Sequence, residues 1–189
     1  MKEMFFDVET SGTDEKVNGI LQLSGEIEID GVAKERFDYK MKPFPDQIIE
    51  DDALEANGIT RAEIENFADP VQCYNQFLKI IGKYVYRYDK KDKLTLIGYN
   101  SRFDDGFLRE WFTRCGADKY TYGSHFWWPA IDVSNMVAVK YRKVRSHFPN
   151  FKLITVAKTL KIEVDESRAH EAMYDMQITK AVYEKCLAS

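Results

Sequence analysis

Three consecutive segments near the amino terminus have the period-two pattern of β-strands, and this pattern limits the fold more than any other feature of the sequence. The first covers residues 4–9, and in the second, residues 20–29, apolar side chains alternate with polar ones as in a half-buried strand. Residues 36–43 repeat the alternation and end in proline. Because short connections join antiparallel neighbours, these segments predict a three-stranded antiparallel meander.

After residue 50 the pattern changes from that of strands to that of helices. Residues 94–99 interrupt it as a further strand, a short strand is expected near residue 131, and residues 117–130 show no clear period. The helices are predicted at residues 51–58, 60–63, 70–85, 101–115, 133–143, 152–160 and 168–187. The predicted fold class is therefore α/β, with a mixed five-stranded sheet, antiparallel first strands and flanking helices.

Composition places the chain among globular proteins. Its 189 residues, 44% of them hydrophobic, are enough for one sizeable core, so residues 1–189 are expected to form a single domain. A net charge of −4 argues against nonspecific adhesion to nucleic acid, although it leaves a nucleic-acid enzyme open. No stretch approaches the roughly 18 apolar residues of a membrane helix, so no membrane partner is expected.

The cysteines give no sign of a disulfide framework or a zinc site. They are odd in number, far apart in the sequence and in no CxxC pair, at positions Cys73, Cys115 and Cys186. No targeting signal is recognisable before Asp7. The expected location is therefore the cytoplasm.

Two carboxylates interrupt the apolar pattern of the first strand. Asp7 and Glu9 are two residues apart, so their side chains point to the same face of the strand. Such a pair is costly in a half-buried place unless a cation holds it, and hard divalent cations prefer oxygen ligands. The alternative is an exposed pair on an edge strand, which would need no metal.

Two later segments supply further polar side chains. Asp104 lies in the first turn of a predicted helix that follows a strand, behind Asn100 and Phe103. His170 and Asp175 are predicted to lie on the last helix, about one and a half turns apart. If these side chains meet Asp7 and Glu9 in the folded chain, they form an acidic cluster with a histidine.

In this order the motifs resemble those of the DEDDh (DnaQ-like) 3'-5' exonucleases, which have a ribonuclease-H-like fold. The resemblance covers nearly the whole chain and is carried by three blocks, Asp7-x-Glu9, Asn100-x-x-Phe103-Asp104 and His170-x4-Asp175. Further stretches such as residues 130–142 and 151–162 are similar to the family as well.

The resemblance implies a phosphodiester hydrolase that acts on the 3' ends of single-stranded DNA or RNA and releases nucleoside 5'-monophosphates. It implies two divalent cations, Mg²⁺ or Mn²⁺, which can stabilise the attacking and leaving oxygens of an in-line displacement at phosphorus. It implies His170 as the general base, since imidazole has a reference pKa near 6.5. The metal ligands that it implies are Asp7, Glu9, Asp104 and Asp175.

Other residues near the motifs are candidates for substrate binding or for structural roles. Thr10, Phe103 and Asn100 are the substrate-binding candidates, although Phe103 also fits the core and Asn100 also fits a loop-ordering role. Asp105 and Asp132 are expected to serve helix starts rather than to bind metal. Two readings stay open for the basic and aromatic segment of residues 139–152, a single-strand contact surface or a solvated helix end. Trp127-Trp128 fits either the core or a stacking surface.

Two other functions are compatible with parts of this pattern. One is a proofreading-type subunit that acts mainly as a polymerase-binding module, with a polymerase or a second copy of the chain as partner. The other is a two-metal phosphatase that acts on small esters. A nuclease assay on oligonucleotides separates both from an exonuclease.

Overall fold

The computed structural model describes residues 1–188 and contains a mixed sheet with the strand order β3-β2-β1-β4-β5. β1 pairs antiparallel with β2, and β2 pairs antiparallel with β3, whereas β1, β4 and β5 run parallel. This arrangement confirms the predicted mixed five-stranded sheet with antiparallel first strands. The strands are β1 (Lys2–Thr10), β2 (Ile20–Ile29), β3 (Val32–Lys40), β4 (Thr95–Gly98) and β5 (Ile131–Asp132).

Helices flank the sheet and occur close to the positions that the sequence predicts. Asp69 caps α3 by accepting hydrogen bonds from two backbone N–H groups, and Thr60 and Glu63 form the predicted capping box of α2. The α-helices are α1 (Asp51–Asn57), α2 (Arg61–Ile64), α3 (Pro70–Ile81), α4 (Ser101–Arg114), α5 (Thr121–His125), α6 (Val133–Lys140), α7 (Leu153–Thr159) and α8 (Ala172–Leu187). Two 3₁₀ helices complete the set, η1 (Arg142–His147) and η2 (Glu166–Arg168).

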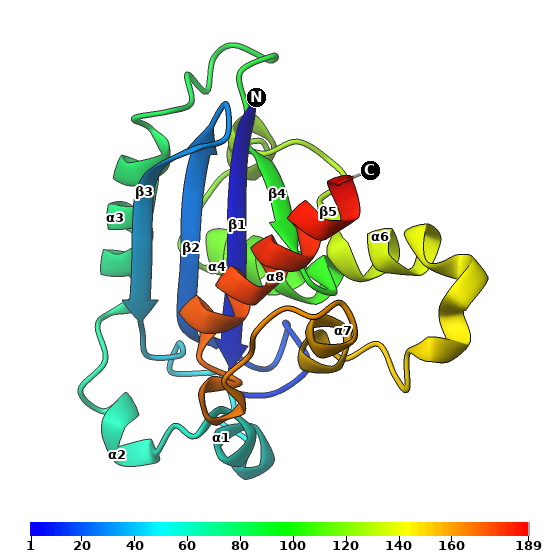
Figure 1. Ribbon diagram of the computed structural model, residues 1–189. Coiled ribbons are helices and arrows are strands. Elements are labelled where there is room, and N and C mark those ends of the chain that lie inside the picture. The colour runs from blue at the N-terminus through cyan, green and yellow to red at the C-terminus, as the bar shows by residue number, and fades with distance from the viewer. Residues whose placement is uncertain (189) are drawn as a thin grey trace.

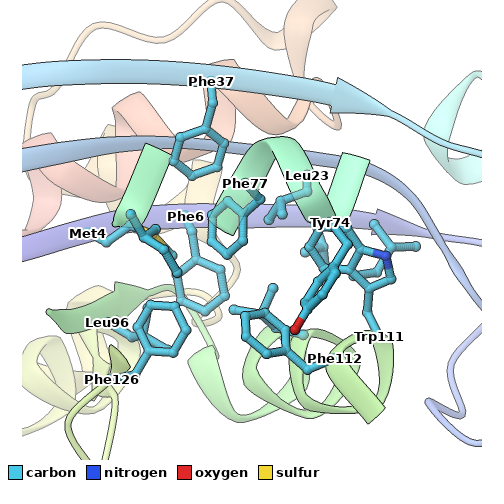
Figure 2. Packing of buried hydrophobic residues seen from close by; sticks show 14 of the residues in the cluster. Met4, Phe6, Leu23, Phe37, Tyr74, Phe77, Leu96, Trp111, Phe112 and Phe126 are labelled. Atoms are coloured by element: carbon cyan, nitrogen blue, oxygen red, sulfur yellow. The ribbon is translucent and has the colours of Figure 1, made fainter. Parts of the chain in front are cut away.

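One face of the sheet is covered by α3 and α4, where aromatic side chains form the larger core. Phe77 of α3 and Phe112 of α4 are fully buried there, and both contact Phe126 through ring pairs. Figure 2 shows these rings packed together with Met4 and Phe6 of β1. The even-numbered residues of β1 therefore face α3 and α4.

The opposite face is covered by α8, which crosses in front of β1 in Figure 1. Phe5 of β1 packs here against Tyr183 of α8, and Val137 of α6 and Val156 of α7 belong to the same buried cluster. Odd-numbered residues of β1 point to this side because side chains alternate along a strand. Asp7 and Glu9 therefore share a face with α8.

The second strand differs from its prediction. Residues 20–29 were expected to be half-buried, but the polar side of β2 is buried as well, including Glu26 and Glu28. The reason is α8, whose Lys180 reaches across to β2 and forms ion pairs with both glutamates. Residues 121–125, for which the sequence shows no period, form the short helix α5. Within residues 1–188, every helix is too short or too polar to cross a membrane.

Candidate active site

Asp7 and Glu9 lie at the carboxyl end of the central strand of the sheet. β4 pairs with β1 only over Glu3–Phe5, so the last residues of β1 extend beyond that pairing. Glu9 is buried and Asp7 is partly exposed. The alternative of an exposed pair on an edge strand is wrong, because β1 has β2 on one side and β4 on the other.

Asp104 reaches this end of the sheet from the first turn of α4. Two residues, Tyr99 and Asn100, separate β4 from α4, and Asn100 makes the turn with φ of 58°. Asparagine tolerates this left-handed conformation better than most residues. Buried Asp104 then accepts a hydrogen bond from the backbone N–H of Val8 at 3.2 Å, which ties α4 to β1 between the two acids.

Asp175 and His170 come from the other side, at the start of α8. Asp175 lies in the first turn of α8, as predicted. His170 does not lie on that helix, because α8 begins at Ala172 and His170 has φ of 69°, outside the helical region. This corrects the prediction that both residues share the last helix. The His170 backbone N–H donates to Asp175 Oδ2 at 3.2 Å, so the bent backbone brings the histidine next to the acid.

The four carboxylates repel one another. Desolvation, followed by repulsion from Asp175 and Asp104, raises the pKa of Glu9 to about 8. Desolvation also raises the pKa of Asp104 to about 7, although the hydrogen bond from Val8 acts in the opposite direction. The pKa of Asp7 is held well above its usual range by desolvation and by its acidic neighbours, and desolvation raises the pKa of Asp175. The protein thus gathers acids at a place where either bound protons or a cation must relieve the repulsion.

The donor set fits hard divalent cations. A ligand atom from each of Glu9, His170 and Asp175 lies within 4.8 Å of the other two. Asp175 Oδ1 is buried and has no hydrogen-bond partner within residues 1–188, which is a costly state for a carboxylate oxygen. Carboxylate oxygens are the ligands that Mg²⁺ and Mn²⁺ prefer.

These side chains surround a pocket with a volume of about 320 Å³. Asp7, Glu9, Asp104, His170 and Asp175 all line it, so the structure brings together the predicted acids and histidine. The substrate-binding candidates Asn100 and Phe103 also line the pocket. Thr10 does not, because its buried hydroxyl donates to the Gly12 carbonyl oxygen at 2.6 Å.

The neighbouring acids have structural roles. Asp132 caps α6 and also accepts a hydrogen bond from the Asn100 backbone N–H, which holds the turn before α4. Asp105 is buried, and it bonds to Arg109 and Tyr122 rather than serving only as an exposed acid at the helix start. Neither lines the pocket.

Three residues that line the pocket were not predicted from the sequence, Val8, Tyr99 and Leu153. The Tyr99 hydroxyl donates to the Phe151 carbonyl oxygen at 2.7 Å and so joins the pocket to the segment before α7. The sequence signal that could have identified Tyr99 is its position at the end of a predicted strand, directly before Asn100.

A profile of the exonuclease family matches residues 4–183, which is nearly the whole chain. The chain belongs to the exonuclease family. The chain is similar to the PolC-type DNA polymerase III of Bacillus cereus, with 25% identity over 182 residues, covering 96% of this chain and 11% of the polymerase. Ribonuclease T of Vibrio parahaemolyticus is 22% identical over 184 residues, covering 94% of this chain and 81% of the relative.

Solved exonuclease structures share the fold. E. coli exonuclease I in complex with a dT13 oligonucleotide superposes with a TM-score of 0.74 and 22% identity, covering 98% of this chain and 40% of that chain. This likeness confirms the predicted ribonuclease-H-like fold. The chain spans about a tenth of the length of the PolC-type polymerases it matches and less than half of exonuclease I.

Proposed function

We propose that this chain is a metal-dependent 3'-5' exonuclease that hydrolyses single-stranded DNA or RNA and releases nucleoside 5'-monophosphates. The observation that carries the proposal is the convergence of four carboxylates and one histidine, from three distant segments, on one pocket. Membership in the exonuclease family supports it. The dT13 complex of exonuclease I, a relative in fold, supports a single strand as substrate.

Asp7, Glu9, Asp104 and Asp175 are proposed to hold two divalent cations, Mg²⁺ or Mn²⁺. When bound, the cations would stabilise charge on the attacking and leaving oxygens of an in-line displacement at phosphorus. The chain contributes the positions of the ligands. The Val8 N–H fixes Asp104, and the His170 N–H fixes Asp175.

His170 is proposed as the general base that takes a proton from the attacking water. Its side chain is exposed at the pocket, where solvent water is available. The water oxygen bonds to phosphorus and the bond from phosphorus to the 3' oxygen breaks. The 3' oxygen takes a proton from solvent water, so the shortened strand leaves with a 3' hydroxyl group. Asn100 and Phe103, which line the pocket, are proposed to contact the terminal nucleotide. Thr10 is proposed to contact the substrate only through its backbone, because its hydroxyl group donates to the Gly12 carbonyl oxygen.

The test is a time course on 5'-labelled and 3'-labelled single-stranded DNA and RNA with Mg²⁺ or Mn²⁺. A 5' label should give a ladder that shortens stepwise, and a 3' label should appear at once as a mononucleotide. Asp104→Asn and excess chelator should each stop the reaction. Release of internal fragments, or undiminished turnover in chelator, would contradict the proposal. Hydrolysis of a chromogenic phosphodiester without any activity on oligonucleotides would instead favour a phosphatase.

The biological setting is proposed from the same observations. Residues 1–189 are proposed to act as one exonuclease domain, and the unpaired thiols Cys73, Cys115 and Cys186 fit the reducing cytoplasm. The PolC-type relatives support a polymerase as partner, and a second copy of the chain is the other candidate. A pull-down with a purified polymerase tests the first candidate, and light scattering during size exclusion tests self-association.

A further inference from the structure

A second, larger groove opens directly beside the catalytic pocket. Its volume is about 810 Å³, compared with about 320 Å³ for the pocket. Tyr99, Asn100, Leu153, His170 and Asp175 line both, so the two spaces are continuous. The outer wall of the groove is formed by α6 and by the chain that leads from η1 to α7, which projects from the body of the protein (Figure 1).

Two cations of this wall carry charge that no acid neutralises. Arg145 and Lys152 both line the groove and are exposed. Within residues 1–188 neither forms an ion pair, although ten other lysine and arginine side chains do. Glu166, an acid of the same groove, is paired with Lys158. In a chain with a net charge of −4, such unpaired cations beside the pocket favour an anionic ligand.

Arg145 also lies over an aromatic ring. Its guanidinium carbon lies 4.3 Å from the centroid of the Phe151 ring, and Phe151 packs in turn against Phe148 at a centroid distance of 5.4 Å. The Tyr99 hydroxyl bonds to the Phe151 carbonyl oxygen and fixes this ring relative to the catalytic pocket. A guanidinium supported on a ring can stack on a nucleobase with its free face and can bond to phosphate with its edge.

We propose that this groove holds the nucleotides on the 5' side of the scissile phosphate, with Arg145 on its Phe151 support as a stacking platform and Lys152 as a phosphate contact. This inference rests on the proposed function, because it places the 3' end in the catalytic pocket. Flat stacking surfaces combined with a few cations suit a flexible single strand. The segment of residues 139–152, for which the sequence left two readings open, is thus assigned to the substrate.

The experiment measures binding without turnover. Anisotropy of 5'-fluorescein-labelled dT12 is recorded in excess chelator, with the probe shown intact on a gel, for the wild type, Arg145→Ala, Arg145→Lys and Lys152→Ala. Arg145→Ala should raise Kd roughly tenfold, within the range for loss of one stacking platform. Each alanine variant should reduce the slope of log Kd against log salt by about 0.7. Arg145→Lys should keep the slope and still lose affinity, because lysine retains the charge without the flat plane.

The matched control is the double variant Lys90→Ala/Lys91→Ala, which removes two exposed charges from the loop between α3 and β4. It should bind dT12 like the wild type. Equal losses in this control, or a Kd within twofold of wild type for both Arg145→Ala and Lys152→Ala, would overturn the inference. If Arg145→Ala lowers the melting temperature, the dT12 affinity of Arg145→Lys decides the role of Arg145 instead.

Turnover in Mg²⁺ separates this inference from the proposed function. If the chain degrades dT12 from the 3' end and Arg145→Ala raises KM with little change in kcat, both stand. If it degrades dT12 and the groove variants match the wild type in Kd and KM, only the groove assignment fails. If dT12 binds through Arg145 and Lys152 but is never cleaved, the exonuclease proposal fails and the binding groove remains.

Discussion

At the scale of single residues, this site depends on acids that destabilise the protein in the absence of a cation. Asp104 shows the principle, because desolvation raises its pKa to about 7 while its Oδ1 accepts the Val8 N–H. Asparagine has the same shape and keeps an oxygen for that hydrogen bond. Asp104→Asn thus removes the charge with little change in packing.

Asp104→Asn should therefore raise the stability of the metal-free protein and remove activity. We expect a gain on the order of 1–3 kcal/mol at pH 8, since each pKa unit corresponds to about 1.4 kcal/mol. Turnover should fall by at least about 10³-fold, because a proposed metal ligand is lost. Urea unfolding in chelator measures the first effect and single-turnover cleavage the second. A less stable variant would show that the Asp104 carboxylate is structural.

His170 provides a second test at this scale, and its backbone decides the substitution. With φ of 69°, alanine would add strain, whereas asparagine adopts this conformation readily. His170→Asn should lower the single-turnover rate by roughly 10²–10⁴-fold, the usual contribution of a general base, while calorimetric Mn²⁺ affinity stays near wild type. Lys90→Ala/Lys91→Ala, in the loop between α3 and β4, is the control and should keep the wild-type rate. Loss of Mn²⁺ binding in His170→Asn would make His170 a metal ligand instead.

At the scale of elements, α8 both covers the sheet and delivers Asp175. Its Lys180 pairs with Glu26 and Glu28 of β2, and all three side chains are largely buried. Burial of the glutamates without Lys180 would be strongly unfavourable, although Arg36 also pairs with Glu26. The ion pairs thus hold the helix that carries one of the four acids.

Lys180→Met should lower the free energy of unfolding by roughly 2–4 kcal/mol, somewhat less than the usual cost of breaking a buried pair because Arg36 remains. Lys185→Met, an exposed lysine on the same helix, should change it by less than about 0.5 kcal/mol. Urea denaturation of the two variants under the same conditions makes the comparison. Equal stability of both would mean that the buried glutamates are protonated or hydrated and do not depend on α8.

At the scale of the whole molecule, the acidic cluster links stability to pH. The pKa of Glu9 is about 8 and that of Asp104 about 7, both above their values in an unfolded chain. Between about pH 4 and pH 8 the folded state therefore binds more protons than the unfolded state, and stability is lost as the pH rises through these values. Acids with a lowered pKa, such as Asp92 and Asp46, titrate below this window.

The melting temperature in chelator should therefore fall as the pH rises from 5 to 8, at constant ionic strength. Mn²⁺ should raise the melting temperature more at pH 8 than at pH 5.5, because it binds the ionised acids. The same scan on Asp104→Asn should show a shallower fall. A metal-free melting temperature that stays constant or rises over this range would contradict the raised pKa values of Glu9 and Asp104.

The sequence by itself determined most of the elements and pointed to the candidate site residues. Period-two alternation gave the first strands, and the capping signals at Thr60 and Asp69 marked helix starts that the structure reproduces. The order of the acids from Asp7 to Asp175 pointed to the family. These signals are local or ordered along the chain, so they need no knowledge of what packs against them.

Only the tertiary structure decided what the second face of the sheet contacts. Glu26 and Glu28 look like solvent-facing residues of a half-buried strand, but α8, some 150 residues later, buries them under Lys180. The turn of His170 out of the last helix and the stacking of Arg145 on Phe151 beside the catalytic pocket likewise depend on how α7 and α8 pack. Burial and electrostatics depend on neighbours in space, and periodicity in a sequence records only neighbours along the chain.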